Sequence, residues 1–425
     1  MRIAIIGTGI AGNVAAWHLN REHDITVFEA GAHIGGHTHT HKVEQAGQPY
    51  NVDTGFIVFN DWTYPNFIQL LEQLGVASQP SAMSFSVRAE PSGLEYNGTS
   101  LNTLFAQRRN LLRPSFWRMI RDILRFNREA PALLSGSGND LNLGDYLAQQ
   151  RYSREFVDHY IIPMGAAIWS TDPVTMQRFP ARFFVRFFHN HGMLSVDRRP
   201  QWRVIRGGSA RYVERLTAPF RDRIRLNTPV EWIRRLPDRV LVKARGLETE
   251  HFDAVFMACH SDQALRLLAD PSPLEQEVLG AIPYQENEAV LHTDTRMLPR
   301  SHRAWAAWNY HVLPEARERV ALTYNMNILQ SLEAPTPFLV TLNHSEAIDP
   351  AKVIRRVSYQ HPLFTPAGVA AQVRQPDING PLRTFYCGAY WRNGFHEDGV
   401  VSALQALDHF RERFAYAQRT LSRTG

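Results

Sequence analysis

The first thirty residues contain the pattern that most restricts how this chain can fold. "RIAIIG" (residues 2–7) is a short apolar, β-branched run, typical of a buried strand. It leads into Gly7, Gly9 and Gly12, the pattern G-x-G-x-x-G, and "AGNVAAWHL" then has the residues and apolar spacing of a helix. "DITVFEA" predicts a second strand ending in Glu29, 17 residues after Gly12. A strand, a glycine turn, a helix and a strand ending in an acid predict a Rossmann-like α/β sheet with a dinucleotide at its edge.

Each residue of this fingerprint has a physical role. Gly7 permits the tight turn, Gly9 lets the backbone approach a pyrophosphate, and Gly12 lets the helix pack closely on the strand. The helix N-terminus presents unpaired N–H groups and a partial positive charge to the phosphates. Glu29 would accept hydrogen bonds from ribose hydroxyls, which favours an unphosphorylated ribose. A purely structural glycine turn is the weaker alternative.

Four histidines follow this unit: His33, His37, His39 and His41. In an extended chain the last three would share one face, because successive side chains alternate. Three imidazoles on one face could bind zinc or copper. The alternative is that they belong to a strand leaving the dinucleotide loop.

Composition limits the class of protein. A chain of 425 residues predicts two or three domains at roughly 150 residues each. With 44% hydrophobic and 20% charged residues it is typical of a globular protein. It has no apolar run of the ~18 residues that a membrane helix needs, and the apolar run before Gly7 is too short for a secretory h-region, so we expect no secretory signal. Cys259 and Cys387 fit neither a zinc nor a disulfide framework. We therefore expect a reducing, cytoplasmic location.

The segment 101–130 is strongly basic, with seven arginines against two acidic residues. Four of these arginines have the spacing of one side of a helix: Arg118, Arg121, Arg125 and Arg128. Such a stripe is either a solvated helix face or a peripheral contact with an anionic phospholipid surface at the inner face of the membrane. No nucleic-acid-binding motif accompanies it, so we expect no nucleic-acid partner.

Glu29, His33, Gly35-Gly36-His37 and Thr40 resemble the motif E-x-x-x-R-x-G-G-R-x-x-T of the flavin-containing amine oxidase superfamily. This superfamily includes protoporphyrinogen oxidase and phytoene desaturase. The resemblance implies an FAD cofactor, with the glycine pair and the next residue around its pyrophosphate. Both family arginines are histidines here, which puts their charge in doubt. The resemblance also favours the flavin loop over a metal site for the histidines, so we expect no bound metal.

Further segments resemble the superfamily. "NVDTGFIVFN" (Asn51–Asn60) has the position of the chain beside the isoalloxazine, and Val230 that of a backbone contact to the adenine. The loop Glu397–Val400 has the position of the helix start that faces flavin N1 and O2. Non-covalent FAD is implied, because Cys387 is not at the usual attachment site. The expected cofactor-binding residues are Gly7, Gly9, Ile10, Ala11, Gly12, Glu29, Ala30, Gly35, Gly36, His37, Thr38, Gly55, Phe56, Ile57, Val230, Gly388, Asp398 and Val400.

The same resemblance implies a domain plan. A discontinuous FAD-binding domain would comprise residues 1–80, 200–268 and 370–425. An α+β substrate domain of the flavin amine oxidase type would comprise a mostly helical part, 81–199, and a sheet part, 269–369. "RFFVRFFHNHG" within the helical part holds Phe183, Phe184, Phe187 and Phe188 beside two arginines. This strip could guide an acyl chain, or be an ordinary core helix.

Within the superfamily, "DTGFIVFN", "PMGAAIWS", "AWNY" and "YNMN" resemble a bacterial branch of predicted NAD/FAD-binding oxidoreductases. That branch is associated with cyclopropane-fatty-acyl synthase-like methyltransferases. The implied function is dehydrogenation of a lipid acyl chain or similar apolar substrate, with a hydride passing to flavin N5. Amine oxidation is an alternative, and a non-catalytic flavin-binding or redox-sensing protein is another. Residues 246–349 contain no lysine, whereas amine oxidases of the family usually keep one near N5.

No catalytic base can be assigned from the sequence. Aromatic and amide residues suited to a flavin-facing pocket are Trp308, Asn309, Tyr310, Tyr324 and Asn325, and they could equally be core residues. His396 would lie near the flavin edge, where it could relay a proton, or it could be a surface histidine.

Overall fold

The computed structural model describes residues 1–135, 141–195, 197–315 and 319–423. The first strand, β1 (Arg2–Ile6), lies in the middle of a five-stranded sheet. The strand order is β10-β2-β1-β14-β20, and every pair is parallel. The other strands are β2 (Asp24–Phe28), β10 (Ile224–Arg225), β14 (Ala254–Met257) and β20 (Thr384–Tyr386).

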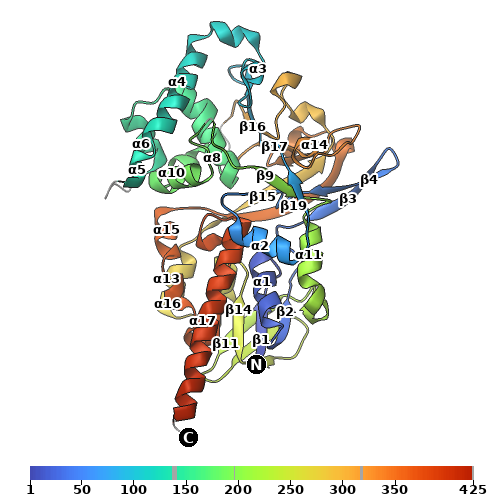
Figure 1. Cartoon of the computed structure of the whole chain (residues 1–425), viewed down its shortest axis with the longest axis vertical. Coiled ribbons are helices and arrows are strands. Elements are labelled where there is room, and N and C mark those ends of the chain that lie inside the picture. Colours follow the sequence, from blue (N-terminus) through green and yellow to red (C-terminus); the bar gives the residue numbers. More distant parts are fainter. Residues whose placement is uncertain (136–140, 196, 316–318, 424–425) are drawn as a thin grey trace.

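Both faces of this sheet are covered, which is why its strands are almost wholly apolar. Ile3 and Ile5 of β1 pack on one face against α1 (Ile10–Leu19), α11 (Ala210–Thr217) and α17 (His396–Arg423). Ala4 and Ile6 point the other way, toward a three-stranded antiparallel sheet. Its strands are β11 (Val230–Arg235), β12 (Val240–Ala244) and β13 (Glu250–Phe252). Figure 1 shows this three-layered unit as the lower part of the molecule.

The upper part of the molecule is built on a seven-stranded mixed sheet (Figure 1). Its order is β19-β15-β18-β17-β16-β7-β8, and within it β16 and β7 are parallel. Two of the strands, β7 and β8, come from the segment that we expected to be mostly helical. Val87 and Ala89 of β7 alternate with Arg88 at the period of a strand, and both are buried. The strands are β7 (Phe85–Ala89), β8 (Leu94–Asn97), β15 (Tyr284–His292), β16 (Trp308–Val312), β17 (Leu322–Asn325), β18 (Leu339–Leu342) and β19 (Val353–Pro362).

Helices cover one end and one face of this sheet. They pack around a second apolar core in which Trp169 contacts the rings of several phenylalanines. The helices are α3 (Leu101–Leu104), α4 (Pro114–Glu129), α5 (Ala132–Ser135), α6 (Leu143–Gln149), α7 (Arg154–Phe156), α8 (Ile162–Trp169), α9 (Pro173–Gln177) and α10 (Ala181–Asn190). A π-helical turn, Val157–Ile161, joins α7 to α8, and a 3₁₀ helix, Arg108–Leu112, precedes α4.

Short elements connect the two parts. A hairpin of β3 (Thr40–Gln45) and β4 (Gln48–Asp53) follows the first unit, and a small sheet joins β5 (Val58–Asn60), β6 (Ser78–Pro80) and β9 (Trp202–Ile205). The remaining helices are α2 (Pro65–Gln73), α12 (Ser261–Leu267), α13 (Pro273–Gly280), α14 (Met326–Leu329), α15 (Pro366–Gln372) and α16 (Gln375–Ile378). Among the helices of the described residues, none combines the length and apolarity needed to cross a bilayer.

Candidate functional site

The glycine turn between β1 and α1 combines close packing with an open surface. Gly7 has a φ of +105°, and a Cβ there would lie 2.9 Å from the Ala258 carbonyl oxygen. A Cβ on Gly12 would lie 2.1 Å from the Gly7 carbonyl oxygen, so helix and strand touch at this point. Gly9 differs, because no atom lies within 4 Å of its Cβ position. Gly9 is also the N-cap of α1 and supplies no side-chain cap, so the first N–H groups of α1 face a surface that can accept an anion.

Glu29 is fixed beside this turn. Its Oε2 accepts hydrogen bonds from the Thr8 backbone N–H (3.0 Å) and hydroxyl (2.5 Å), and its Oε1 accepts one from the Gly31 N–H (2.7 Å). The carboxylate oxygens can accept further bonds from ribose hydroxyls. Val230 starts β11 nearby, since the Thr228 N–H donates to the Glu29 carbonyl oxygen at 2.8 Å.

Two loops border the glycine turn. The loop after β2 touches it, because a Cβ on Gly36 would lie 3.1 Å from the Gly9 Cα. The second loop, between β4 and β5, packs on the first: the Phe56 N–H donates to the His37 carbonyl oxygen at 2.8 Å. Gly35 to Thr38 therefore lie next to Gly9, and Gly55 to Ile57 lie against this first loop.

The start of α17 closes the site. A Cβ on Gly399 would lie 2.5 Å from Cγ2 of Ile10, so the first turns of α17 and α1 are in contact. Asp398 accepts hydrogen bonds from the N–H groups of Asn393 and Phe395, and burial raises the pKa of its carboxyl to about 7. Two helix N-termini thus meet beside Gly9, a concentration of positive dipole ends suited to a phosphorylated, anionic ligand.

His396 is buried rather than on the surface. Its Nε2 lies 2.9 Å from the Tyr212 hydroxyl and 3.0 Å from the Thr38 hydroxyl, and its ring stacks on Phe56 with centroids 3.4 Å apart. Burial holds its pKa well below the usual value, so the imidazole is neutral at pH 7. His396 therefore ties α17 to both loops of the site.

The histidines that follow Glu29 do not share one face. His39 stacks on His33 and meets His41 at a tilt, with ring centroids 4.0 and 4.1 Å away. His37 turns elsewhere and packs on Tyr359 and His361 of β19. The expected alternation fails because β3 begins only at Thr40. Among the described residues, no group of three or more His, Cys, Asp or Glu is placed to hold a metal ion.

Buried polar atoms at the border of the site have no partner within the described residues. They include Nε2 of His37 and Nδ1 of His260 at the end of β14. Burial lowers the pKa of His37 and of His260 to about 4, so both are neutral, and His37 does not replace the charge of the second arginine of the motif. Phosphate and hydroxyl oxygens of a dinucleotide would give such N–H groups acceptors. Together with the open Cβ position of Gly9, these atoms fit FAD.

The remaining predicted cofactor residues lie around this site. Gly388 follows β20 and donates its N–H to the Ser402 hydroxyl of α17 at 2.9 Å. Val400 lies on α17 and is buried against the parallel sheet. Ala30, next to Glu29, is exposed. Ile10 and Ala11 form the first turn of α1.

The catalytic candidates on β16 and β17 divide between the two faces of the mixed sheet. Trp308, Tyr310 and Tyr324 point toward α8, and Trp308 meets Tyr324 edge-on at 5.0 Å. Burial raises the pKa of both tyrosines, so both are neutral phenols. Ile57, from the loop beside His396, belongs to the same apolar cluster. Ile57 and this aromatic face are therefore parts of one packed apolar core.

Asn309 lies on the opposite face and is fully occupied. Its Oδ1 accepts from Ser86 and from the Ala306 N–H, and its Nδ2 donates to the carbonyl oxygens of Ala306 and Thr323. Asn325 caps α14 through the Ile328 N–H. The Asn309 amide therefore has no group left for a substrate, and the Asn325 side-chain oxygen serves as a helix cap.

The phenylalanine strip of α10 belongs to the helical core. Phe184, Phe187 and Phe188 are buried, and Phe183 stacks on Phe364. The core-helix alternative is therefore correct, and the strip does not line an open path.

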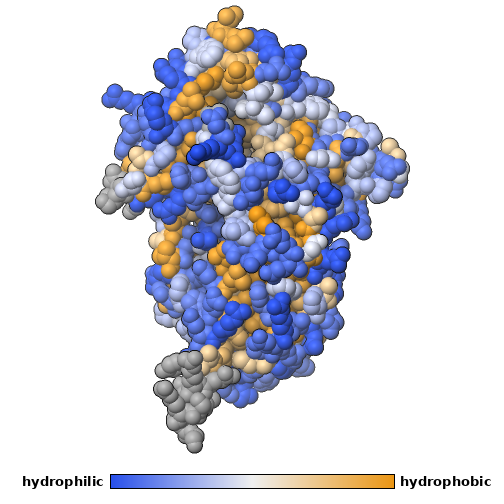
Figure 2. All heavy atoms as spheres, in the orientation of Figure 1, coloured by the Kyte–Doolittle hydropathy of each residue, from blue (hydrophilic) through white to orange (hydrophobic). Residues whose placement is uncertain are grey.

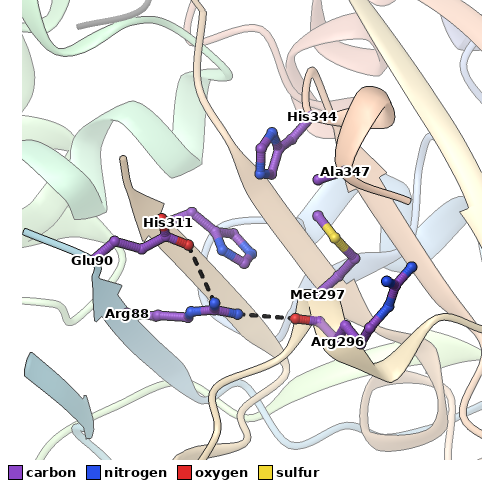
Figure 3. A pocket seen from close by; sticks show the side chains of 7 residues that line it. All are labelled: Arg88, Glu90, Arg296, Met297, His311, His344 and Ala347. Carbon is purple, nitrogen blue, oxygen red and sulfur yellow. Dashed lines mark hydrogen bonds and ion pairs between the residues drawn. The ribbon is translucent and has the colours of Figure 1, made fainter. Parts of the chain in front are cut away.

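A separate cavity of about 190 Å³ lies on the far face of the mixed sheet (Figure 3). Its charges are already paired: Arg88 binds Glu90, Arg296 binds Asp294, and His344 contacts Glu346. The lining residues are Arg88, Glu90, Arg296, Met297, His311, His344 and Ala347. It is distinct from the dinucleotide site.

Sequence reasoning missed three residues that hold the site together. Asp53 is buried, accepts from Thr40, Ser209 and Gln330, and burial raises its pKa to about 6. Tyr212 binds His396, and Tyr359 binds Thr54 at 2.8 Å. Asp53 lies within "NVDTGF", so a signal was present, but the partners of all three are distant in sequence.

Comparisons with known proteins agree with this geometry. A family model described as flavin containing amine oxidoreductase matches residues 10–318. Cyclohexylamine oxidase from Brevibacterium oxydans has a TM-score of 0.71 at 16% identity, covering 97% of this chain and 99% of the other. A putative protoporphyrinogen oxidase from Exiguobacterium sp. has a TM-score of 0.69 at 17% identity, covering 96% and 98%.

A CLA-producing fatty acid isomerase from P. acnes is also similar, with a TM-score of 0.66 at 15% identity, covering 96% and 98%. No functionally curated protein matches this chain significantly. At these identities the solved structures are evidence for the fold, and they confirm the predicted α/β architecture.

Proposed function

This chain belongs to the family of flavin-containing amine oxidoreductases, and we propose that it uses FAD to dehydrogenate a lipid acyl chain or a similarly apolar substrate. The observation that carries the substrate class is the apolar region that runs from Ile57 to Trp308, Tyr310 and Tyr324. It is aromatic and aliphatic, and its two tyrosines are neutral. Side chains of this kind suit contact with a hydrocarbon substrate better than with a cationic one.

The residues of the dinucleotide site have separate roles in this proposal. The first turn of α1 would hold the pyrophosphate, Glu29 the ribose, and the first turn of α17 the flavin edge. Bound FAD supplies the two-electron acceptor for the hydride. Ile57 and the aromatic face would position the carbon chain and exclude water.

Dehydrogenation removes a hydride from one carbon and a proton from its neighbour, which leaves a double bond. No described residue is assigned as the base for this proton. Burial keeps the pKa of His396 low, so its neutral imidazole is a weak base, and it is proposed only to hold the start of α17 in place. Thr38 and Tyr212, which bind its Nε2, are the adjacent hydroxyls.

Amine oxidation is the second candidate, favoured by the family and by the cyclohexylamine oxidase among the similar structures. The sequence between residues 246 and 349 has no lysine to offer near the flavin. The side chains proposed to meet the substrate, Ile57, Trp308, Tyr310 and Tyr324, also carry no negative charge that would bind an ammonium group.

Anaerobic mixing of the FAD-loaded protein with candidate substrates tests the proposal. We expect the flavin absorbance to bleach with unsaturated or methyl-branched phospholipid, and to stay unchanged with primary amines or polyamines. Gly9→Val, which we expect to lack flavin, is the blank for lipid scattering. Bleaching by an amine and by no lipid would assign amine oxidation. If neither the lipids nor the amines bleach the flavin, a non-catalytic flavin-binding or redox-sensing protein is favoured.

A further inference from the structure

The end of the molecule formed by α3, the 3₁₀ helix 108–112 and α4 exposes large apolar side chains. Leu112 is 87% exposed and Leu101 76% exposed, and exposed apolar side chains that gather in one patch mark an interaction surface. Figure 2 shows orange side chains gathered at this upper end of the molecule. The exposed apolar residues of the segment are Leu101, Leu111, Leu112, Trp117 and Leu124, which we call the apolar tip.

The apolar tip is bordered by positive charge. From Tyr96 to Arg121 the chain has five arginines and no acidic residue. Arg113 and Arg121 take part in no ion pair or hydrogen bond of a side chain among the described residues. The acidic residues that follow are Asp122, which is buried, and Glu129, which pairs with Arg125 and Arg128.

The predicted arginine stripe therefore needs a correction. Arg118 binds Glu155, and Arg125 lies over the ring of Tyr152 at 3.9 Å while pairing with Asp122 and Glu129. The outward face of α4 instead alternates apolar and basic side chains, in the order Trp117, Arg121, Leu124 and Arg128. These residues are four, three and four apart, so they follow one side of the helix.

We propose that the apolar tip is a docking surface for an anionic phospholipid bilayer. Leucine and tryptophan side chains would enter the interface between headgroups and acyl chains, while Arg113 and Arg121 would meet lipid phosphates. Charge complementarity commits the surface to anionic lipid, because Arg113 and Arg121, which border it without an ion pair among the described residues, are cations. Docking is independent of the proposed chemistry, since it requires neither turnover nor a particular substrate.

Vesicle flotation with the full-length, FAD-loaded protein tests this inference. We expect the protein to float with phosphatidylcholine vesicles that contain phosphatidylglycerol, and not with phosphatidylcholine alone. Arg113→Gln and Arg121→Gln should each weaken the partition about five-fold. Leu111→Ser combined with Leu112→Ser should weaken it at least about ten-fold, because the inserted apolar surface is lost.

Matched controls come from the other part of the molecule. Val373→Ser removes an equally exposed apolar side chain from the end of α15, and Arg245→Gln removes an exposed arginine beyond β12. Both should float like the wild type. If Arg245→Gln weakens flotation as much as Arg121→Gln, binding reflects net charge alone and the proposal is wrong. A dimer in solution that dissociates in the Leu111→Ser, Leu112→Ser variant, without any lipid binding, would assign the tip to a second copy of the chain.

Discussion

Gly9 and Gly12 are three residues apart, yet their replacement should have different consequences. Valine at Gly9 meets no protein atom, so we expect the unfolding free energy of the FAD-free protein to change by less than about 0.5 kcal/mol. The same side chain would occupy the position of the pyrophosphate and abolish measurable FAD binding. Urea unfolding and titration with FAD, followed by flavin fluorescence, measure the two effects.

Gly12→Ala is the matched variant, because its Cβ would overlap the Gly7 carbonyl oxygen. We expect a loss of about 1–3 kcal/mol of stability even without FAD. Equal destabilisation by both substitutions, or normal FAD binding by Gly9→Val, would contradict the assignment of the glycine turn.

The two cysteines are poorly suited to covalent attachment of the flavin. Cys387 is fully buried on the strand end before Gly388, and burial raises the pKa of its thiol, so it carries no thiolate nucleophile. Burial likewise raises the pKa of Cys259 to about 12. We expect acid precipitation to release all flavin into the supernatant. Flavin that remains in the pellet, and that persists in Cys387→Ser, would point to another attachment residue.

Between elements, one buried ion pair joins three layers of the lower unit. Arg235 of β11, with no exposed side-chain surface, binds Glu275 of α13, and Glu275 also accepts from the Tyr386 hydroxyl of β20. Arg235→Met would leave Glu275 charged and buried without its partner. We expect a loss of about 3–5 kcal/mol in the unfolding free energy measured with denaturant.

The double variant Arg235→Met, Glu275→Gln is the control for this pair. Removing the unpaired charge should recover part of the lost stability, by at least about 1 kcal/mol relative to Arg235→Met alone. If the losses of stability in Arg235→Met and in Glu275→Gln alone add up to the loss in the double variant, the two residues are not coupled.

For the whole molecule, buried histidines set the response to acid. Burial lowers the pKa of His292 to about 4 and of His311 to about 3, against about 6.5 in the unfolded chain. Below pH 6.5 the unfolded state therefore binds more protons, so stability falls as the pH drops from 6.5 toward 4. Each such histidine costs about 1.4 kcal/mol per pH unit in this window. Asp53 and Asp398, whose pKa values are raised to about 6 and about 7, act with the opposite sign.

Urea midpoints at a series of pH values across that window measure the slope. His292→Gln should reduce the slope by the equivalent of about one proton. His302→Gln, at an exposed position, should leave it unchanged. An unchanged slope in His292→Gln would mean that His292 is protonated in the folded state.

The parts of this fold that could be predicted from the sequence are local. Gly7 to Glu29 form a strand, turn, helix and strand whose signals lie within thirty residues, and the parallel sheet followed from them. What could not be predicted depends on distant partners. The pairing of Arg118 with Glu155, the turning of His37 toward β19, and the saturation of Asn309 by Ser86 and Thr323 all join segments that no local pattern connects.

The five-stranded sheet takes its strands from the first 28 residues, from residues 224–257 and from residues 384–386. A chain that is still on the ribosome therefore has its glycine turn long before it has α17, the second helix that borders the cofactor. At about 5–20 residues per second, tens of seconds separate the synthesis of these two helices. During that interval the nascent protein has only half of its cofactor site. A chain that stops before residue 384 lacks α17, so it should not retain flavin.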